Sequence, residues 1–218
     1  MSEQEDWPDP SSDAVARVEY DVAVWIPCPP GFPPGYDRQG WAQMFAEGFW
    51  KRPGLSYTDM DIALLAARLT EIHQETYGHI PCHQAFIHLP DPRLTPLPVY
   101  VATWKSDGER DEQLRAMTHA TDPGSVRAPV IDEITTETLG TGLRVLLYLP
   151  VEGADEEIYG ALNYAWRVEE FQTDLRIFTV CRDLGRLQRA IGDIDELARV
   201  TTIVPLTREA NTEGWSTS

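Results

Sequence analysis

The chain has 218 residues, a formal net charge of −17, 42% hydrophobic residues and three cysteines. A chain of this length forms one domain, or at most two small ones, and needs no metal or disulfide to fold. No apolar run approaches the roughly 18 residues that span a bilayer, and the acidic start lacks the basic and apolar parts of a secretory signal, so we expect a cytoplasmic protein.

The charge also limits the partners. Sequence-independent binding to nucleic acid depends on Lys and Arg, so an acidic chain disfavours it and favours a basic protein partner, unless the charge serves only solubility. Cys28, Cys82 and Cys181 are odd in number and far apart, which indicates reduced thiols. Lysine occurs only at Lys51 and Lys105, and this arginine-rich composition resembles that of acidic proteins from high-GC actinobacteria. The resemblance carries no motif and implies no activity.

The N-terminal part is predicted to form a tail, a strand and a loop. Residues 1–14 are polar and charged, with little beyond Trp7 to bury, so we expect a disordered tail before a single domain of residues 15–206. Apolar residues then alternate with mostly polar ones, which predicts a strand near 15–26. The segment CPPGFPPGYDRQG contains four prolines, which lack the N–H donor that a sheet needs, so it is predicted to be a loop.

Two helices are predicted after this loop. Residues 39–50 place their large apolar side chains on one helical face, and residues 59–77 carry a longer apolar stripe. Thr58 with Asp61 three residues later is an acidic form of the capping signal, and Gly78 is in the place of a C-terminal cap.

A hairpin and a short helix are predicted next. Strands are expected at about 83–89 and 98–104, joined by the proline-rich segment PDPRLTPLP. Residues 108–120 suggest a short surface helix, which an Asp-Pro-Gly sequence ends.

The stretch 129–181 has the clearest pattern, because four strand-like runs follow one another with short turns. The first run ends at LGTG, whose glycines can supply the positive φ of a tight hairpin. The others are expected at 143–149, 162–168 and 175–179. Period-two alternation puts one set of side chains on a packed face and the other nearer water.

The C-terminal part is predicted to be helical. Asp183 is expected to cap one helix and Asp193 a second, both within 184–201, and residues 207–218 are expected to be a disordered tail.

These elements predict an α+β fold. The antiparallel sheet consists of the 129–181 meander, with the three earlier strands as possible extensions, and the predicted helices cover one or both of its faces. An α/β/α sandwich such as the Mog1/PsbP-like architecture accommodates this order, which is an analogy of fold and implies no function.

The densest group of metal-binding side chain types is His73, His79, Cys82, His83 and His88. Zinc takes four nitrogen or sulfur ligands in a tetrahedron, and the segment HIPCH could supply three of them. The spacing matches no recognised zinc pattern, and a histidine in an apolar helix stripe is more often a neutral, hydrogen-bonded core residue. A metal-dependent or cysteine enzyme centred on these residues is therefore kept as an alternative.

Other catalytic patterns are weak. Cys82 beside His83 could form a thiolate, but neighbours on a strand face opposite ways. There is no GxSxG, no phosphate-binding GK[ST] and no carboxylate spacing typical of a calcium loop. We expect no cofactor.

The proline-rich loop is the feature most suggestive of recognition. Its Phe32 and Tyr36, together with Trp25 and Trp50, are the candidate binding residues, because aromatic side chains with prolines supply contact area at a low cost in entropy. The alternative is a flap that packs over the helices. The sequence thus favours a non-catalytic protein that binds another protein or a small ligand, and the charge alone suggests an acidic neutraliser of a basic partner as a further alternative.

Overall fold

The structure is a computed structural model that describes residues 13–151, 153 and 157–206. Within these residues, one antiparallel sheet has seven strands in the order β2-β3-β4-β8-β7-β6-β5, and β1 pairs with β9 in a separate ribbon. The strands are β1 (Ala14–Val18), β2 (Trp25–Cys28), β3 (Gln84–His88), β4 (Leu97–Lys105), β5 (Val130–Thr136), β6 (Gly140–Pro150), β7 (Ile158–Val168), β8 (Thr173–Cys181) and β9 (Thr201–Pro205). The helices are α1 (Arg38–Trp50), α2 (Asp59–His79), α3 (Arg110–Met117) and α4 (Leu184–Val200). The predicted α+β class is confirmed.

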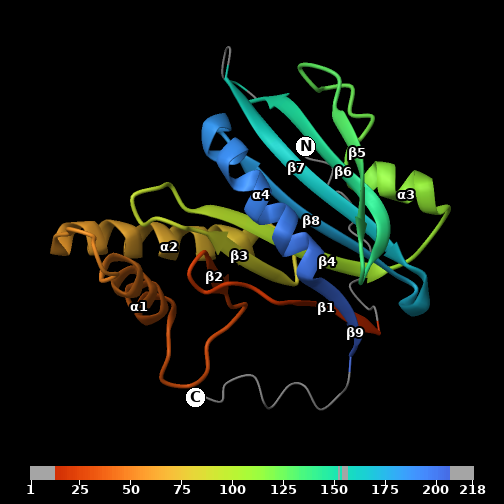
Figure 1. Ribbon diagram of the computed structural model, residues 1–218. Coiled ribbons are helices and arrows are strands. Elements are labelled where there is room, and N and C mark those ends of the chain that lie inside the picture. Colours follow the sequence, from red (N-terminus) through yellow and green to blue (C-terminus); the bar gives the residue numbers. More distant parts are fainter. Residues whose placement is uncertain (1–12, 152, 154–156, 207–218) are drawn as a thin grey trace.

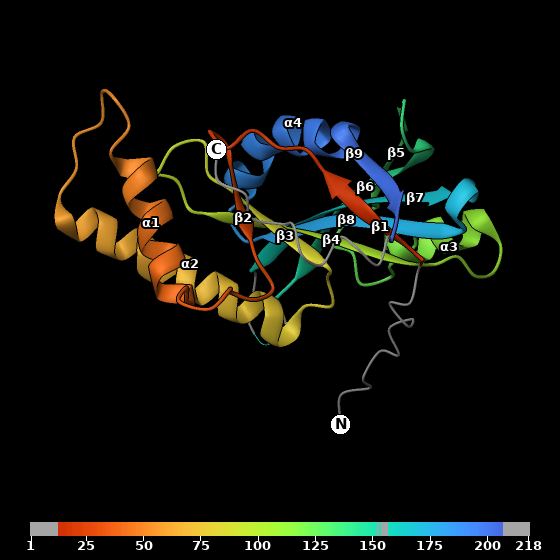
Figure 2. The ribbon, with the colours of Figure 1, turned by 90° about the horizontal axis from the view of Figure 1, so that it is seen from below.

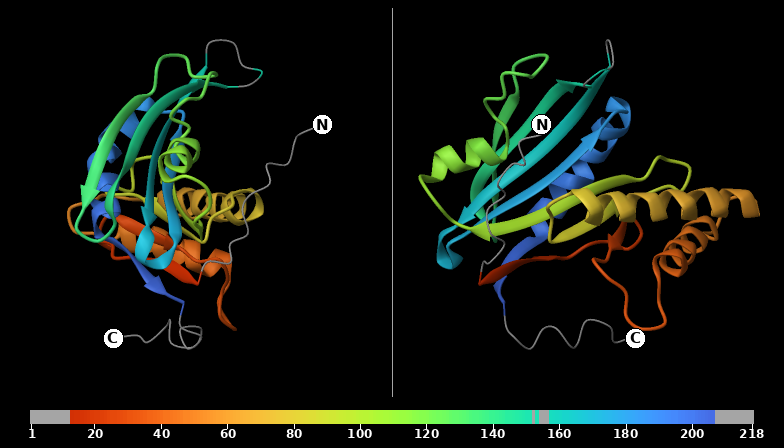
Figure 3. Two further views of the ribbon diagram at one scale, coloured as in Figure 1. Left: turned by 90° about the vertical axis from the view of Figure 1, so that its right-hand side faces the viewer. Right: turned by 180° about the vertical axis from the view of Figure 1, so that it is seen from behind.

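Helices cover both faces of the large sheet (Figures 1 and 2). Helix α4 and the β1–β9 ribbon pack on one face, where they bury Leu162, Tyr164 and Trp166 of β7. Helices α1 and α2 pack on the other face over β2, β3 and β4. Helix α3 lies on that same face, over β6 and β7 (Figure 3). The expectation that one set of side chains of β7 lies nearer water was therefore wrong, because both faces are covered and residues 160–166 are all buried.

The predicted meander is present, and its register shows what its glycines do. The β5–β6 turn ends at Gly140, whose φ of +73° is the left-handed conformation that favours glycine. Gly142 lies inside β6, opposite Ile134, and a Cβ atom there would collide with the Ala165 carbonyl oxygen and the Trp166 ring. Gly142 is thus required by close packing on β7 and not by the turn.

The predicted strand at 15–26 is divided in two. Asp21 forms a turn after β1: its side chain accepts a hydrogen bond from the Ala23 N–H at 2.8 Å, and its carbonyl accepts from the N–H groups of Val24 and Trp25. The turn sends the chain into β2, which pairs with β3, whereas β1 pairs with β9 near the other end of the chain. The alternating pattern of the sequence continued through this turn, so it could not reveal the break.

The two predicted C-terminal helices are a single helix, α4. Asp183 is its N-cap and accepts from the Arg186 N–H, as predicted. Asp193 lies inside the helix and its carboxylate instead contacts His88 of β3. Helix α4 ends at Val200 and the chain enters β9, an element that was not predicted.

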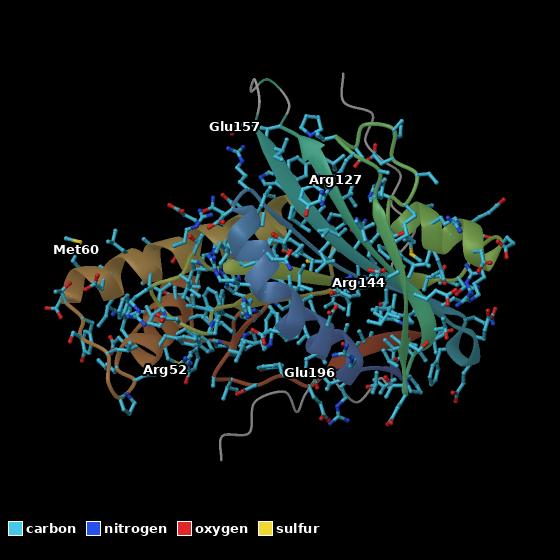
Figure 4. All side chains as sticks on the ribbon, turned by 45° about the horizontal axis from the view of Figure 1, so that its top comes forward. Arg52, Met60, Arg127, Arg144, Glu157 and Glu196 are labelled. Atoms are coloured by element: carbon cyan, nitrogen blue, oxygen red, sulfur yellow. The ribbon has the colours of Figure 1, made fainter. Side chains whose placement is uncertain are left out.

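Helices α1 and α2 form an antiparallel pair at one end of the molecule. The Thr58–Asp61 capping box is present at the start of α2, as predicted. Helix α2 continues through Gly78 to His79, two residues past the predicted end, so Gly78 is not the cap. Figure 4 shows Met60 at the outer end of α2, away from the sheet. Within the described part of the chain, none of the helices combines the length and apolar character needed to cross a membrane.

Candidate ligand-binding site

Three of the four histidines predicted as a metal group, His73, His83 and His88, lie in separate hydrogen-bond networks. His73 of α2 accepts a hydrogen bond at Nδ1 from the Arg38 Nε–H (3.1 Å), and its Nε2 lies 2.8 Å from the Pro29 carbonyl oxygen. The Phe32 ring stacks on it at 5.0 Å between centroids. Burial lowers the pKa of His73, so the ring is neutral and joins the proline-rich loop to the helices.

His88 lies on the opposite face of the sheet, against α4. Its Nδ1 is 2.8 Å from Nη2 of Arg186, and its Nε2 is 2.7 Å from the Asp193 carboxylate. Because a guanidinium can only donate, Nδ1 is the acceptor and Nε2 carries the proton. Burial, and then the charge of Arg186, lower the pKa of His88 against the opposing effect of Asp193.

The remaining members of the predicted group are also apart. His83 accepts at Nδ1 from the Thr103 N–H at 3.0 Å, and burial lowers its pKa. Burial raises the pKa of Cys82 to about 12, which keeps that thiol protonated at neutral pH. Among the residues that the structure describes, no three His, Cys, Asp or Glu side chains are placed to share a metal ion.

The aromatic residues predicted for recognition have different environments. Trp25 and Trp50 are buried, and the ring of Trp25 lies 4.8 Å from that of His88 on the α4 face. Phe32 is partly buried over the α1–α2 layer, which is the flap arrangement. Tyr36 alone of these four is exposed, at 70%, so a recognition role for the loop stays a prediction carried by Tyr36.

A cavity that the sequence did not suggest lies between α2 and α3. Figure 3 (right) shows these two helices on the same face of the sheet, with β7 and β8 visible in the space between them. The cavity has a volume of about 480 Å³, in the range of small-molecule sites. Its rim includes His79–Pro81 at the C-terminal end of α2 and His119 after α3, and its floor is formed by side chains of β6, β7 and β8.

Arg176 of β8 supplies a positive charge on this floor. Its side chain is buried, at 7% exposure, and its Nη2 donates to Oδ1 of Asn163 on β7 at 2.7 Å. The guanidinium carbon lies 4.3 Å from the centre of the Phe178 ring, which fixes the plane of the group. Ala161, Leu147 and Leu149 make much of the remaining floor apolar. The site therefore combines a buried cation with apolar walls.

The rim contains an unusual backbone conformation. His119 follows α3 with a φ of +56°, a left-handed conformation that is uncommon for residues other than glycine. Since the Ala120 N–H donates to the Arg115 carbonyl at 3.0 Å, His119 is the left-handed residue that closes the C-terminal end of α3. Both α2 and α3 reach the cavity with their C-terminal ends, which are weakly negative, so an anion is best accommodated at Arg176 on the sheet side.

The sequence contained one usable signal for this site. Arg176 lies in the middle of the apolar run DLRIFTV. Its strand has neighbouring strands on both sides, so its side chain must be buried when helices cover both faces of the sheet. Reading this alternation as apolar inside and polar outside concealed Arg176 and Asn163. No protein-family model matches the chain, and no curated protein matches its sequence.

Proposed function

We propose that this protein is a non-catalytic binding protein of the bacterial cytoplasm and that its cavity between α2 and α3 binds a small organic anion. The observation that carries the proposal is the buried guanidinium of Arg176 on the floor of a largely apolar cavity of about 480 Å³. A carboxylate is the matching group, because the planar fork of arginine can donate two parallel hydrogen bonds to it.

The energies support a charged ligand over a neutral one. Two unit charges 4 Å apart attract by about 4 kcal/mol at an effective dielectric constant of 20, and part of this offsets the loss of hydration of the carboxylate. Apolar contacts with Leu147, Leu149 and Phe178 add about 25 cal/mol for each Å² removed from water. A compact carboxylate with an apolar ring or chain satisfies both requirements.

A cysteine beside the adjoining cavity supports binding over catalysis. Cys181 lines the neighbouring part of the sheet face, and burial raises the pKa of its thiol, which disfavours the nucleophilic thiolate.

A pair of matched probes tests the proposal. Benzoate and the neutral benzamide have nearly the same shape, so isothermal titration of the wild-type protein should show benzoate binding at least tenfold more tightly. Arg176→Gln keeps a donor for Asn163 but removes the charge, and should abolish that preference, whereas Arg189→Gln at an exposed position of α4 should retain it. Circular dichroism checks that both variants fold. Equal affinities for the two probes in the wild-type protein would refute the proposal.

A basic protein partner is a second candidate, favoured by the edge strand β5. This strand ends the large sheet and exposes Val130, Ile131, Asp132 and Glu133, on a chain of net charge −17. An extended basic segment could pair with such an edge and neutralise its carboxylates. Titration with an alternating Val-Arg peptide should give an affinity that falls as the salt concentration rises. The double variant Asp132→Lys, Glu133→Lys should abolish this binding. Unchanged affinity in the double variant would exclude this edge.

For the fold family we propose the Mog1/PsbP-like α/β/α sandwich. Helices on both faces of one antiparallel sheet support this assignment. A superposition in which the strand order of that family differs from β2-β3-β4-β8-β7-β6-β5 would refute it.

A further inference from the structure

A second cavity adjoins the one that contains Arg176. It has a volume of about 710 Å³ and lies toward the end of the sheet where β6 ends and β7 begins. Asp122, Leu149, Tyr159 and Val180 line both cavities. Shared walls make the two cavities one continuous groove along the sheet face.

The strand register gives the direction and length of this groove. Arg176 pairs with Ala165, and successive rows on the same face are Asn163 with Phe178, Ala161 with Val180, and then Tyr159 with Leu149. Residues two apart on a strand are separated by roughly 6.7 Å, so these three steps extend about 20 Å from Arg176. The groove is thus much longer than a benzoate-sized ligand requires.

The groove changes in character along this length. Its cationic end is buried, whereas its middle is lined by Leu149, Tyr159 and Val180 together with the carboxylate of Asp122. The side chain of Val180 is 44% exposed. It therefore offers an accessible apolar surface that a ligand chain would cover. At the far end Arg182 is within 3.6 Å of Glu157, at the tip of the sheet (Figure 4).

From this pattern we propose that the ligand is an elongated amphipathic carboxylate, such as an acyl chain of about eight to twelve carbons, with its carboxylate at Arg176 and its chain directed past Val180. The inference rests on the proposed function of the cavity. A phosphate-rich ligand such as a nucleotide fits less well, because the carboxylate of Asp122 lies beside the junction of the two cavities and would repel a second anionic group.

A chain-length series tests the inference. Each methylene group that becomes buried should strengthen binding about fourfold. Titration of the wild-type protein with butanoate, octanoate and dodecanoate should therefore give dissociation constants that fall steadily along the series, by at least a hundredfold overall. Val180→Trp should narrow the junction and weaken dodecanoate binding at least tenfold more than it weakens butanoate binding. Val130→Trp, at a comparably exposed valine on β5, is the matched control and should bind all three like the wild type.

The outcomes separate the two proposals. If butanoate or benzoate binds in an Arg176-dependent way but longer chains bind no more tightly, the elongated ligand is refuted and the anion site stands. If Val180→Trp leaves dodecanoate binding unchanged, the chain does not pass that residue and the inference is refuted. If no carboxylate binds, or if dodecanoate binds Arg176→Gln as well as the wild type, both proposals fail.

Discussion

Replacing Arg186 with methionine should strongly destabilise the protein, although this residue is remote from the candidate site. Arg186 of α4 is 1% exposed and connects the helix to the sheet. Its Nε donates to the Thr95 carbonyl at 2.9 Å, and its Nη2 lies 2.8 Å from both Nδ1 and the carbonyl oxygen of His88. Methionine has a similar length but no donor, so the Thr95 carbonyl and the two buried acceptors of His88 would lose this partner.

The expected magnitude follows from these contacts. A buried acceptor left without a hydrogen bond costs about 1–3 kcal/mol, and removing one member of a buried charged network typically costs about 3–5 kcal/mol in total. For a chain of 150–250 residues, 1 kcal/mol corresponds to about 2–4 °C in melting temperature, so the variant should melt about 6–20 °C lower.

The same variant should change how stability depends on pH. In the folded protein the pKa of His88 lies below its ordinary value of 6.5, chiefly through burial and then through Arg186. Below pH 6.5 the unfolded chain therefore binds more protons than the folded protein, and stability falls as the pH is lowered. His73 and His83 have pKa values shifted in the same direction and add to this loss. Without the Arg186 charge the pKa of His88 rises, so acid should reduce stability less in the variant.

Urea unfolding at pH 7.5 and pH 5.5, followed by tryptophan fluorescence, measures both effects. The deficit of Arg186→Met relative to the wild type should be about 3–5 kcal/mol at pH 7.5 and smaller at pH 5.5. Arg189→Met removes the same charge from an exposed position of α4 and should stay within about 0.5 kcal/mol of the wild type. A deficit below about 1 kcal/mol for Arg186→Met at pH 7.5 would show that the network does not stabilise the fold as reasoned.

Three further predictions concern single positions. Gly142→Ala should cost about 1–3 kcal/mol because the added Cβ has no room against β7. Gly48→Ala in α1, where no atom lies within 4 Å of the added Cβ, should instead stabilise the protein by about 0.4–1 kcal/mol. Urea unfolding measures both variants, and equal effects would contradict the packing argument. Thr58→Ala should cost about 1 kcal/mol by removing the cap of α2, measured as a lower urea midpoint, and an unchanged midpoint would count against the capping box. Asp174→Ala should cost about 3–5 kcal/mol by leaving the buried Arg167 without its carboxylate 2.7 Å away, and a thermal melt within 2 °C of the wild type would disprove this.

Features set by neighbouring residues were predictable from the sequence. The hairpins of residues 129–181, the capping box at Thr58 and the N-cap at Asp183 depend on turn residues and alternation within a few positions. These signals are local, so they survive without knowledge of what packs on them.

Features that depend on distant packing were not predictable. The pairing of β1 with β9 places Ala14 opposite Pro205, and no local pattern in either segment predicts that the two segments pair. Asp193 resembles a helix cap in sequence, but it lies within α4 because His88, far away in the chain, supplies its contact.

The candidate site is the clearest case of this division. The alternation along β7 and β8 determines which side chains share a face, and this alternation can be read from the sequence. Only the tertiary structure decided that helices cover both faces, and this converts Arg176 and Asn163 from expected surface residues into the buried polar floor of a cavity. The physical reason is that strand period depends on the backbone alone, whereas the environment of each face depends on elements that pack on it from elsewhere in the chain.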